Sequence, residues 1–209
     1  PPSRPKNPPP PRHNDLTQLE RLLEEHHTVH HRVIIVTESI FSMDGDQADL
    51  QKLTELKRKY DNVLLYVDEA HAFGVRGRQG LGCAEEFHCI HDIDFLVGTF
   101  GKAAASVGAY IVCKKVIREY LVNRMRTLIF TTGLPPVNIA WTLFIVRRLA
   151  DMQERRKHLA HISRTLREAL QVRGYTCPSV SHIVPMIIGP SADTVLQAEA
   201  LQRHGVLDL

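Results

Sequence analysis

The chain has 209 residues, of which 44% are hydrophobic and 23% are charged. These values are ordinary for a globular protein, and they exclude a disordered chain, a collagen-like repeat and a disulfide scaffold. The net charge of +3 comes without a cluster of Lys and Arg, so nucleic acid is not an expected partner. The cysteines are irregularly spaced, the first residues do not resemble a signal peptide, and no apolar run approaches the roughly 20 residues that span a bilayer. We therefore expect a cytoplasmic protein with reduced thiols and no membrane partner.

The first half of the chain predicts alternating helices and buried strands. Residues 1–11 hold seven prolines and are expected to form a proline-rich leader outside the fold. Leucine spacing predicts amphipathic helices over 15–25 and about 48–60. Continuous apolar runs predict three strands buried on both faces and a fourth strand after them. These runs are 33–36, 63–67, 95–98 and 109–113.

The second half predicts mainly helices. Trp141 and Phe144 fall at helical spacing within a long periodic segment and are expected to belong to the core. Two prolines suit the start of that segment and Gly174 suits its end. The predicted elements are a helix over about 115–124, the periodic segment over about 137–172, a strand over 183–188 and a helix over 194–203.

Polar side chains follow each of the three predicted buried strands. Strands linked by helical crossovers run parallel, so their carboxyl ends meet at one edge of the sheet, where ligands bind in such folds. This pattern predicts a single site at that edge. The residues concerned are Ser39 and Ser42, Asp68 and His71, and Thr99 and Lys102.

Two of these residues have distinctive surroundings. Lys102 follows a buried strand among small residues, which can leave its amine desolvated and able to act as a Schiff-base nucleophile; a solvated surface charge is the alternative. Asp68 ends an apolar run, where a carboxylate needs a cation such as the protonated ring nitrogen of pyridoxal phosphate (PLP). For Asp68 the alternatives are a turn cap and a magnesium ligand.

The string VDEAH at 67–71 also resembles the second nucleotide motif of DEAH-type helicases. That function requires a phosphate loop, G-x-x-x-x-G-K-[ST], in which the lysine precedes the acidic motif. Here Lys102 follows the acidic motif, Leu96 stands where the loop needs its first glycine, and Ala103 stands where it needs a hydroxyl. The sequence therefore disfavours a nucleotide hydrolase.

Four motifs in order resemble those of one family. They are TESIFSMDGD at 37–46, VDEAHAFGVRGRQGLG at 67–82, GTFGKA at 98–103 and IFTTGLPP at 129–136. Together they are similar to the α-oxoamine synthases, fold-type-I PLP-dependent transferases of the α/β class with a mostly parallel sheet. The resemblance covers about 12–205. It implies that 12–140 form part of a PLP-binding large domain, and that 141–209 form an interdomain helix and the start of a smaller α+β domain.

The resemblance also implies roles for six residues. Lys102 would bind the PLP aldehyde as a Schiff base and move the α-proton of the substrate. Asp68 would pair with the ring nitrogen, and His71 would hydrogen-bond the phenolic oxygen. A homodimer with shared active sites is implied, because one cofactor contact would come from a neighbouring subunit. The remaining contacts would be Ser42 near the phenolic oxygen, Thr99 at the phosphate, and Thr132 at the phosphate of the other subunit.

Within this family the chain looks most like the member that condenses L-alanine with a pimeloyl thioester of CoA or a carrier protein. That decarboxylating acyltransferase reaction gives 8-amino-7-oxononanoate in biotin synthesis. Ala104 and Ala105 depart from the family pattern, in which a bulkier residue and a glycine are common at these positions. Members of the glycine C-acetyltransferase, 5-aminolevulinate synthase and serine palmitoyltransferase types share the same catalytic positions and stay open as alternatives.

The chain is about half as long as a usual family member. The family has a ring-stacking histidine and a glycine-rich phosphate segment before the matched region, and a carboxylate-binding arginine after it. We therefore expect this polypeptide alone to be weakly active or inactive, and a non-catalytic interaction module is a further alternative. No metal is expected, because four candidate ligands fit no standard zinc spacing. They are Cys83, His88, Cys89 and His91.

Overall fold

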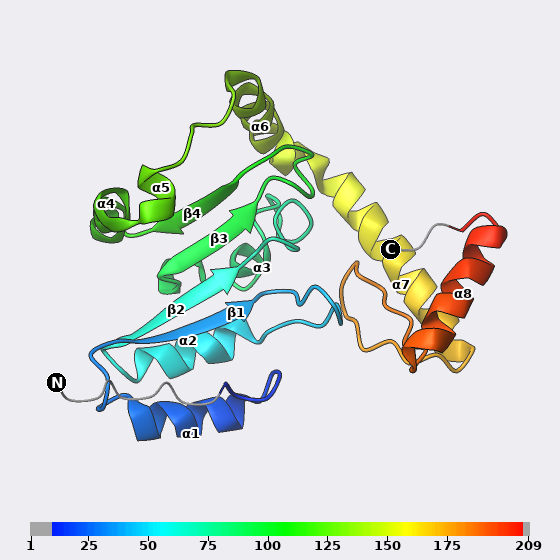
Figure 1. Cartoon of the computed structure of the whole chain (residues 1–209), viewed down its shortest axis with the longest axis horizontal. Coiled ribbons are helices and arrows are strands. Elements are labelled where there is room, and N and C mark those ends of the chain that lie inside the picture. Colours follow the sequence, from blue (N-terminus) through cyan, green and yellow to red (C-terminus); the bar gives the residue numbers. More distant parts are fainter. Residues whose placement is uncertain (1–9, 207–209) are drawn as a thin grey trace.

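A computed structural model describes residues 10–206, so the predicted leader lies outside the described residues except for positions 10 and 11. Its centre is a four-stranded sheet of order β1-β2-β3-β4, in which β1 to β3 are parallel and β4 is antiparallel to β3 (Figure 1). This mostly parallel sheet confirms the predicted fold class. The strands are β1 (Val33–Glu38), β2 (Val63–Asp68), β3 (Phe95–Thr99) and β4 (Ala109–Cys113).

Helices flank the sheet and continue beyond it towards the C-terminus (Figure 1). Asp15 and Asp49 begin α1 and α2, because their side chains accept hydrogen bonds from backbone N–H groups in the first turn. Within the described residues, no helix combines the length and apolarity needed to cross a membrane. The helices are α1 (Leu16–His26), α2 (Leu50–Arg58), α3 (Cys83–Glu86), α4 (Lys115–Arg124), α5 (Arg126–Ile129), α6 (Pro136–Arg148), α7 (Gln153–Val172) and α8 (Ser191–Arg203), with 3-10 turns η1 (Ile90–Asp92) and η2 (Leu149–Met152).

The main core lies between the sheet and the helices α1 and α2. In Figure 1, α2 lies below β1 and β2, and α1 lies below α2. Leu56 of α2 packs with Leu65 and Val67 of β2, and all three side chains are fully buried. The same cluster includes Ile35 of β1 and Leu96 of β3. Because this core fixes the three parallel strands together, it also fixes where their carboxyl ends lie.

The other face of β1 is exposed, so the prediction that this strand is buried on both faces is wrong. Ile34 and Val36 are 51% and 69% exposed, whereas Ile35 between them is buried. Alternate residues of a strand point to opposite faces. The helices α1 and α2 cover only the face that holds Ile35, and no element within residues 10–206 buries the opposite face of β1.

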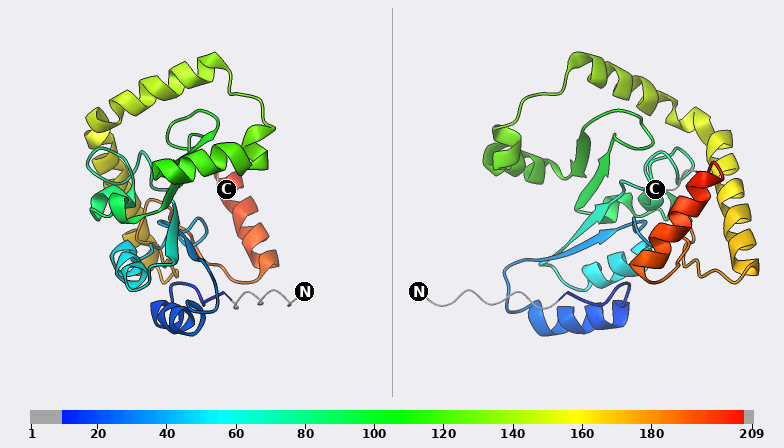
Figure 2. Two further views of the ribbon diagram at one scale, coloured as in Figure 1. Left: turned by 90° about the vertical axis from the view of Figure 1, so that its left-hand side faces the viewer. Right: turned by 45° about the vertical axis from the view of Figure 1, so that its right-hand side comes forward.

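The predicted periodic segment over 137–172 consists of two helices, α6 and α7, which are separated by η2. Figure 2 shows that these helices form a long arm running from one side of the sheet to the C-terminal part. Trp141 and Phe144 on α6 are 45% and 47% exposed, so their prediction as core residues is wrong. The reason is that α6 has no buried residue. The Nε1 of Trp141 donates to the carbonyls of Ala104 and Ala105, on the sheet side, at 3.1 Å each.

The predicted strand over 183–188 is also wrong. Ile187 forms one isolated bridge with Thr176. Pro185 lies within this run and has no N–H to donate to a ladder. The preceding residues instead contact the turn after β1, where the N–H of Val180 donates to the carbonyl of Gly45 at 3.2 Å. The domain boundary near 140 stays a prediction.

Candidate active site at the carboxyl ends of the strands

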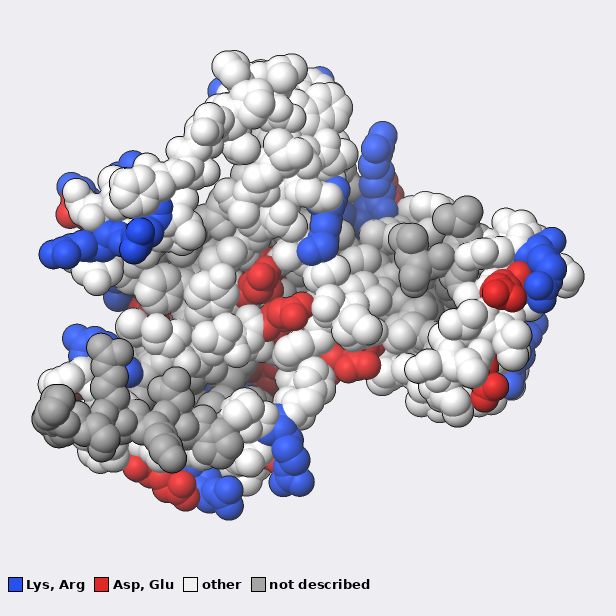
Figure 3. Space-filling view, in the orientation of Figure 1, with Lys and Arg blue, Asp and Glu red and all other residues white. Residues whose placement is uncertain are grey.

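The carboxyl ends of β1, β2 and β3 lie at one edge of the sheet, as predicted from the parallel crossovers. Glu38 is the register partner of Asp68, and Asp68 is the partner of Val97. Backbone bonds continue beyond the strands, since the N–H of Ser39 donates to the Asp68 carbonyl at 2.9 Å and that of Glu69 donates to the Val97 carbonyl at 2.7 Å. In Figure 3, acidic side chains gather in the middle of the molecule, where β1 and β2 end in Figure 1.

A tight turn after β2 carries Asp68 and His71. The Asp68 carboxylate accepts a hydrogen bond from the N–H of Ala70 at 2.7 Å. The Glu69 carbonyl accepts from the N–H of Ala72 at 2.9 Å, which closes the turn over His71. Both site side chains are half-buried. The turn therefore holds a carboxylate and an imidazole side by side at the end of the central strand.

The charges around His71 show which groups the fold brings together. Burial lowers the pKa of the His71 imidazole, and the positive charge of Lys102 lowers this pKa further. The carboxylates of Glu38 and Asp68 act in the opposite direction. The imidazole is therefore favoured in its neutral form at neutral pH, in which one ring nitrogen donates and the other accepts. Lys102 and Asp68, which come from two different strand ends, thus each lie within electrostatic reach of His71.

Lys102 lies on the loop between β3 and β4. Thr99 shapes the start of this loop, because its Oγ1 accepts from the N–H of Gly101 at 3.1 Å and donates to the carbonyl of Gly108 at 3.1 Å. The Lys102 carbonyl accepts from the N–H of Ala105 at 2.9 Å, and Ala105 adopts a left-handed φ of 46°. The Lys102 side chain is exposed, so the expected desolvation of its amine is wrong for the described residues and the alternative, a solvated charge, is what the structure shows. The loop therefore presents a primary amine to solvent at the same edge as Asp68.

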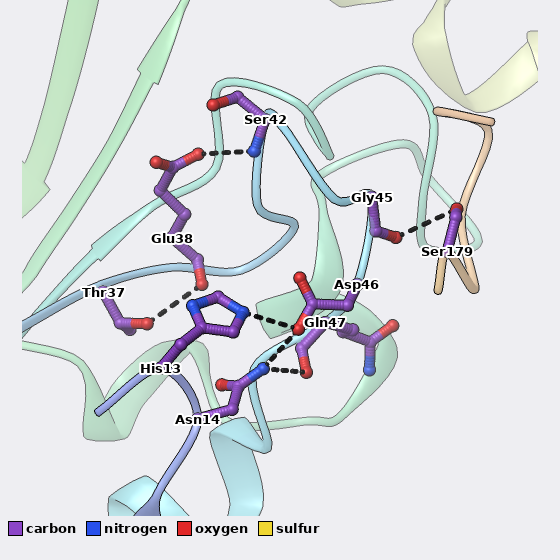
Figure 4. A network of polar contacts seen from close by, with 9 residues as sticks. All are labelled: His13, Asn14, Thr37, Glu38, Ser42, Gly45, Asp46, Gln47 and Ser179. Carbon is purple, nitrogen blue, oxygen red and sulfur yellow. Dashed lines mark hydrogen bonds and ion pairs between the residues drawn. The ribbon is translucent and has the colours of Figure 1, made fainter. Parts of the chain in front are cut away.

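The other two predicted site residues lie on exposed segments. Ser42 is in the turn after β1, and its N–H donates to the Glu38 carboxylate at 3.2 Å (Figure 4). Thr132 lies on the exposed connection between α5 and α6. In the part of the chain that the structure describes, Thr132 makes no hydrogen bond to the other predicted site residues. Ser42 is thus tied to the site through Glu38, while Thr132 is not.

Sequence reasoning missed Glu69, which is fully buried behind Asp68. Its carboxylate accepts hydrogen bonds from the Ser39 hydroxyl at 2.6 Å and from the N–H groups of Cys83 and Ala84 at 3.0 and 2.6 Å. Burial raises the pKa of Glu69, although these three hydrogen bonds oppose the shift. Gly82 makes room for this carboxylate, since a Cβ there would lie 2.5 Å from Oε2. A carboxylate next to an apolar strand and followed by a glycine-rich loop is the signal that could have identified it.

The cysteines of the Cys83, His88, Cys89 and His91 group are buried and poor metal ligands. Burial raises the pKa of the Cys83 thiol to about 12 and that of the Cys89 thiol to about 11. The thiolate is the form that binds metals, so both side chains are held in the unreactive form.

A second polar group, around Asp46, joins the N-terminal segment to the turn after β1 (Figure 4). The Asp46 Oδ2 lies 2.8 Å from the His13 Nε2 and accepts from the Asn14 Nδ2 at 2.6 Å. Asp44 has a carboxylate oxygen within 4.8 Å of both His13 and Asp46. The polar atoms of His13 and Asn14 therefore both contact one carboxylate oxygen of Asp46. This network links the N-terminal segment to the turn after β1.

The fold is that of a known family. The sequence matches the aminotransferase class I and II family over residues 4–207, and the chain belongs to that family. A relative from Glaesserella parasuis serovar 5 (strain SH0165) named putative 8-amino-7-oxononanoate synthase is 56% identical over 195 residues, covering 93% of this chain and 51% of its own length. The 8-amino-7-oxononanoate synthase of Haemophilus ducreyi is 52% identical, covering 92% of this chain and 51% of its own length. The chain thus spans about half the length of the curated relatives it matches.

Solved structures agree with this membership. A serine palmitoyltransferase from Sphingomonas wittichii superposes with a TM-score of 0.86 at 31% identity, covering 93% of this chain and 49% of that one. An 8-amino-7-oxononanoate synthase from Francisella tularensis superposes with a TM-score of 0.82 at 26% identity, covering 93% of this chain and 56% of that one. The predicted family and fold class are therefore confirmed.

Proposed function

We propose that this chain carries the lysine, aspartate and histidine of a PLP-dependent acyltransferase that condenses L-alanine with a pimeloyl thioester. The reaction would release CO2 and the free thiol and give 8-amino-7-oxononanoate. The observation that carries the proposal is the arrangement at the sheet edge, where Lys102 and Asp68 both act by charge on the half-buried His71. The names of the relatives at 52–56% identity support the choice of reaction.

The donor groups at this edge fit PLP. Within residues 10–206 neither Asp68 nor Lys102 has an ion-pair partner. A half-buried carboxylate without a cation suits a protonated ring nitrogen, and an exposed primary amine suits an aldehyde. One solved relative, a serine palmitoyltransferase variant, is described with PLP. We therefore assign the ring nitrogen to Asp68, the aldehyde to Lys102, the phenolic oxygen to His71 and Ser42, and the phosphate to Thr99.

Each residue then has a task that its surroundings support. PLP supplies an electron sink that stabilises negative charge at the α-carbon of an amino acid. The negative charge of Asp68 would keep the ring nitrogen protonated, and the N–H of Ala70 holds the carboxylate in place. Lys102 would move the α-proton, and its exposed loop gives its amine the freedom to do so. His71, favoured as neutral imidazole, can donate a hydrogen bond to the phenolic oxygen without adding charge.

A serine palmitoyltransferase-type reaction, with serine and a longer acyl thioester, is the second candidate, because such enzymes are among the solved structures with the best superposition. Their identity of 28–31% is well below the 52–56% of the relatives named for the alanine reaction. We therefore favour the alanine reaction.

The complete enzyme would be a cytoplasmic homodimer in which Thr132 reaches the phosphate site of the partner subunit. Thr132 is exposed and shares no hydrogen bond with Lys102 in the described part of the chain, which supports a contact with a neighbouring subunit. Because the chain spans about half the length of its relatives, we expect cofactor binding to be weak and turnover to be low for this polypeptide alone.

The test is covalent trapping of PLP on the full 209-residue chain. PLP would be titrated while absorbance is recorded at the violet edge of the visible range, then reduced with borohydride, and the modified peptide identified by mass spectrometry. We expect modification at Lys102, its loss in Lys102→Ala, and no change in the exposed control Lys114→Ala. Modification spread evenly over surface lysines would contradict the site and favour a non-catalytic module. With PLP bound, alanine, glycine and serine would then be compared against pimeloyl and palmitoyl thioesters.

A further inference from the structure

A second cavity, of about 320 Å³, lies between the turn after β2, one side of α7 and the segment around His182. Four of its six polar lining residues are arginines, and no carboxylate among the described residues contributes to it. The charged and titratable lining residues are Arg76, Arg156, Arg164, Arg167 and His182. We refer to it as the arginine cavity.

The positive charge of the arginine cavity is poorly compensated. Arg76 forms a two-pronged ion pair with Glu86 at 2.7 and 2.8 Å. Arg156 is only 8% exposed, yet its guanidinium donates only to backbone carbonyls, those of Leu149 and Arg78. Carbonyl oxygens satisfy its N–H groups but do not neutralise its charge. A buried cation without an anion is unfavourable, so an anion beside Arg156 would be stabilised.

The rest of the lining leaves donors available. Arg167 donates to the Ser181 carbonyl at 2.8 Å through one nitrogen only, and Arg164 is exposed with no hydrogen bond or ion pair inside the described stretch. The Nδ1 of His182 is buried without a hydrogen-bond partner. Burial lowers the pKa of His182, and the positive charges of a protonated His71 and of Arg76 lower it further. The cavity is thus short of negative charge and has free donors facing it.

We propose that the arginine cavity binds the phosphate group of a phosphate ester. Guanidinium groups hold phosphate oxygens with paired, charge-assisted hydrogen bonds, and clusters of arginines are a recurrent phosphate site. The volume lies at the lower end of the range of about 300–1,000 Å³ for small-molecule pockets, which exceeds what a bare phosphate ion needs. A phosphorylated ligand therefore fits better than an inorganic anion.

The position of the cavity links it to the proposed reaction. Arg76 follows His71 by five residues, and His182 lies close enough to His71 for protonation of His71 to lower the pKa of His182. An acyl thioester of CoA carries phosphate groups, as does the arm of a carrier protein. Resting on the proposed function, we assign the cavity to the phosphate end of this acyl donor; the phosphate site itself does not depend on PLP or on Lys102.

The test is isothermal titration of the full chain, without PLP and at low ionic strength, with CoA, inorganic phosphate and pimelate as separate probes. Arg164→Gln and Arg167→Gln remove guanidinium groups from the rim of the cavity. Arg155→Gln is the matched control, since Arg155 is an exposed residue of α7 that does not line the cavity. Hydrogen bonds to charged groups contribute enough that each rim variant should weaken CoA binding about tenfold. Thermal unfolding of each variant verifies that it is folded.

The outcomes separate the possible ligands. CoA binding more tightly than inorganic phosphate, and weakened in the two rim variants but not in Arg155→Gln or Lys102→Ala, supports the proposal. Equal loss in Arg155→Gln would show a general charge effect and overturn it, as would binding of pimelate alone or of no probe. Trapping of PLP at Lys102 in the Arg164→Gln variant is measured separately, so failure of the arginine cavity is distinguishable from failure of the proposed function.

Discussion

Replacing Glu69 with Gln tests the buried carboxylate that supports the turn with Asp68 and His71. The wild-type carboxylate accepts three hydrogen bonds and donates none: two reach Oε2, from the hydroxyl of Ser39 and the N–H of Cys83, and one reaches Oε1, from the N–H of Ala84. A glutamine has one acceptor oxygen and an NH2 group that only donates. In either orientation of the amide, the NH2 faces a buried backbone N–H.

The expected magnitude follows from this count. Leaving one buried donor unsatisfied costs about 1–3 kcal/mol, so Glu69→Gln should lower the free energy of unfolding by about that amount. The loss depends on pH. Because the folded-state pKa of Glu69 is raised, the folded state binds more protons than the unfolded state above the ordinary glutamate pKa of about 4.3. Wild-type stability from this group is therefore full below that pKa and declines as the pH rises through the folded pKa. The difference between wild type and variant should narrow as the pH rises.

The assay is urea unfolding followed by circular dichroism at about pH 5 and about pH 8, both above the ordinary glutamate pKa, where the raised folded-state pKa makes stability fall with pH. Glu85→Gln is the control. Glu85 also accepts two backbone N–H bonds, from Gln79 and Leu81 at 2.8 and 2.9 Å, but it is partly exposed and water can replace them. The reasoning is refuted if Glu69→Gln costs no more than Glu85→Gln, or if its cost grows as the pH rises.

Three further changes test the surroundings of the site. Because their folded-state pKa values are lowered, His71 and His182 bind fewer protons in the folded than in the unfolded state. The free energy of unfolding should therefore fall as the pH drops below about 6.5. Between about pH 5 and 7, a plot of this free energy against pH should be less steep for His71→Asn or His182→Asn than for the wild type. Gly98→Ala places a Cβ 2.5 Å from a tyrosine ring on β4 and should cost about 1–3 kcal/mol, seen as a lowered Tm, whereas Gly133→Ala, with nothing within 4 Å, should not. Ala105→Gly relieves a left-handed φ of 46° at a strain of about 1–2 kcal/mol and adds about 0.4–1 kcal/mol of unfolded-chain entropy, so urea unfolding should show unchanged or slightly increased stability.

The sheet and the place of the site could be predicted because both follow from local patterns. Apolar runs with polar ends mark the strands, and helical crossovers force β1, β2 and β3 to be parallel. That is sufficient to bring Asp68 and Lys102 to one edge. The exposure of Ile34 and Val36 could not be predicted, because a continuous apolar run shows that a strand can be covered on both faces and not what covers it.

The other differences arise from contacts between distant residues. Asp68 and His71 were predicted as site residues from the motif that also holds Glu69. Glu69 was not predicted, because only the fold shows that Ser39 and the start of α3 surround its carboxylate. The arginine cavity joins Arg76 to residues of α7 that lie about 80–90 positions further along the chain, so no spacing rule connects them. The run 183–188 was wrongly predicted as a strand, because a strand needs a neighbouring strand to pair with and a single apolar segment does not specify one.

The turn from Glu69 to Arg76 connects the two proposed sites, because its first part carries His71 and its end lines the arginine cavity. The N–H of Arg76 donates to the carbonyl of Ala72 at 2.9 Å, and the Arg76 carbonyl accepts from Gly82 at 3.1 Å, directly before the N–H groups that bind the Glu69 carboxylate. A Glu69→Gln variant that is still folded should therefore weaken both PLP trapping at Lys102 and CoA binding, whereas a change at either site alone should affect one. If PLP trapping and CoA binding are both unaltered in that variant, the backbone hydrogen bonds hold the turn without the buried carboxylate.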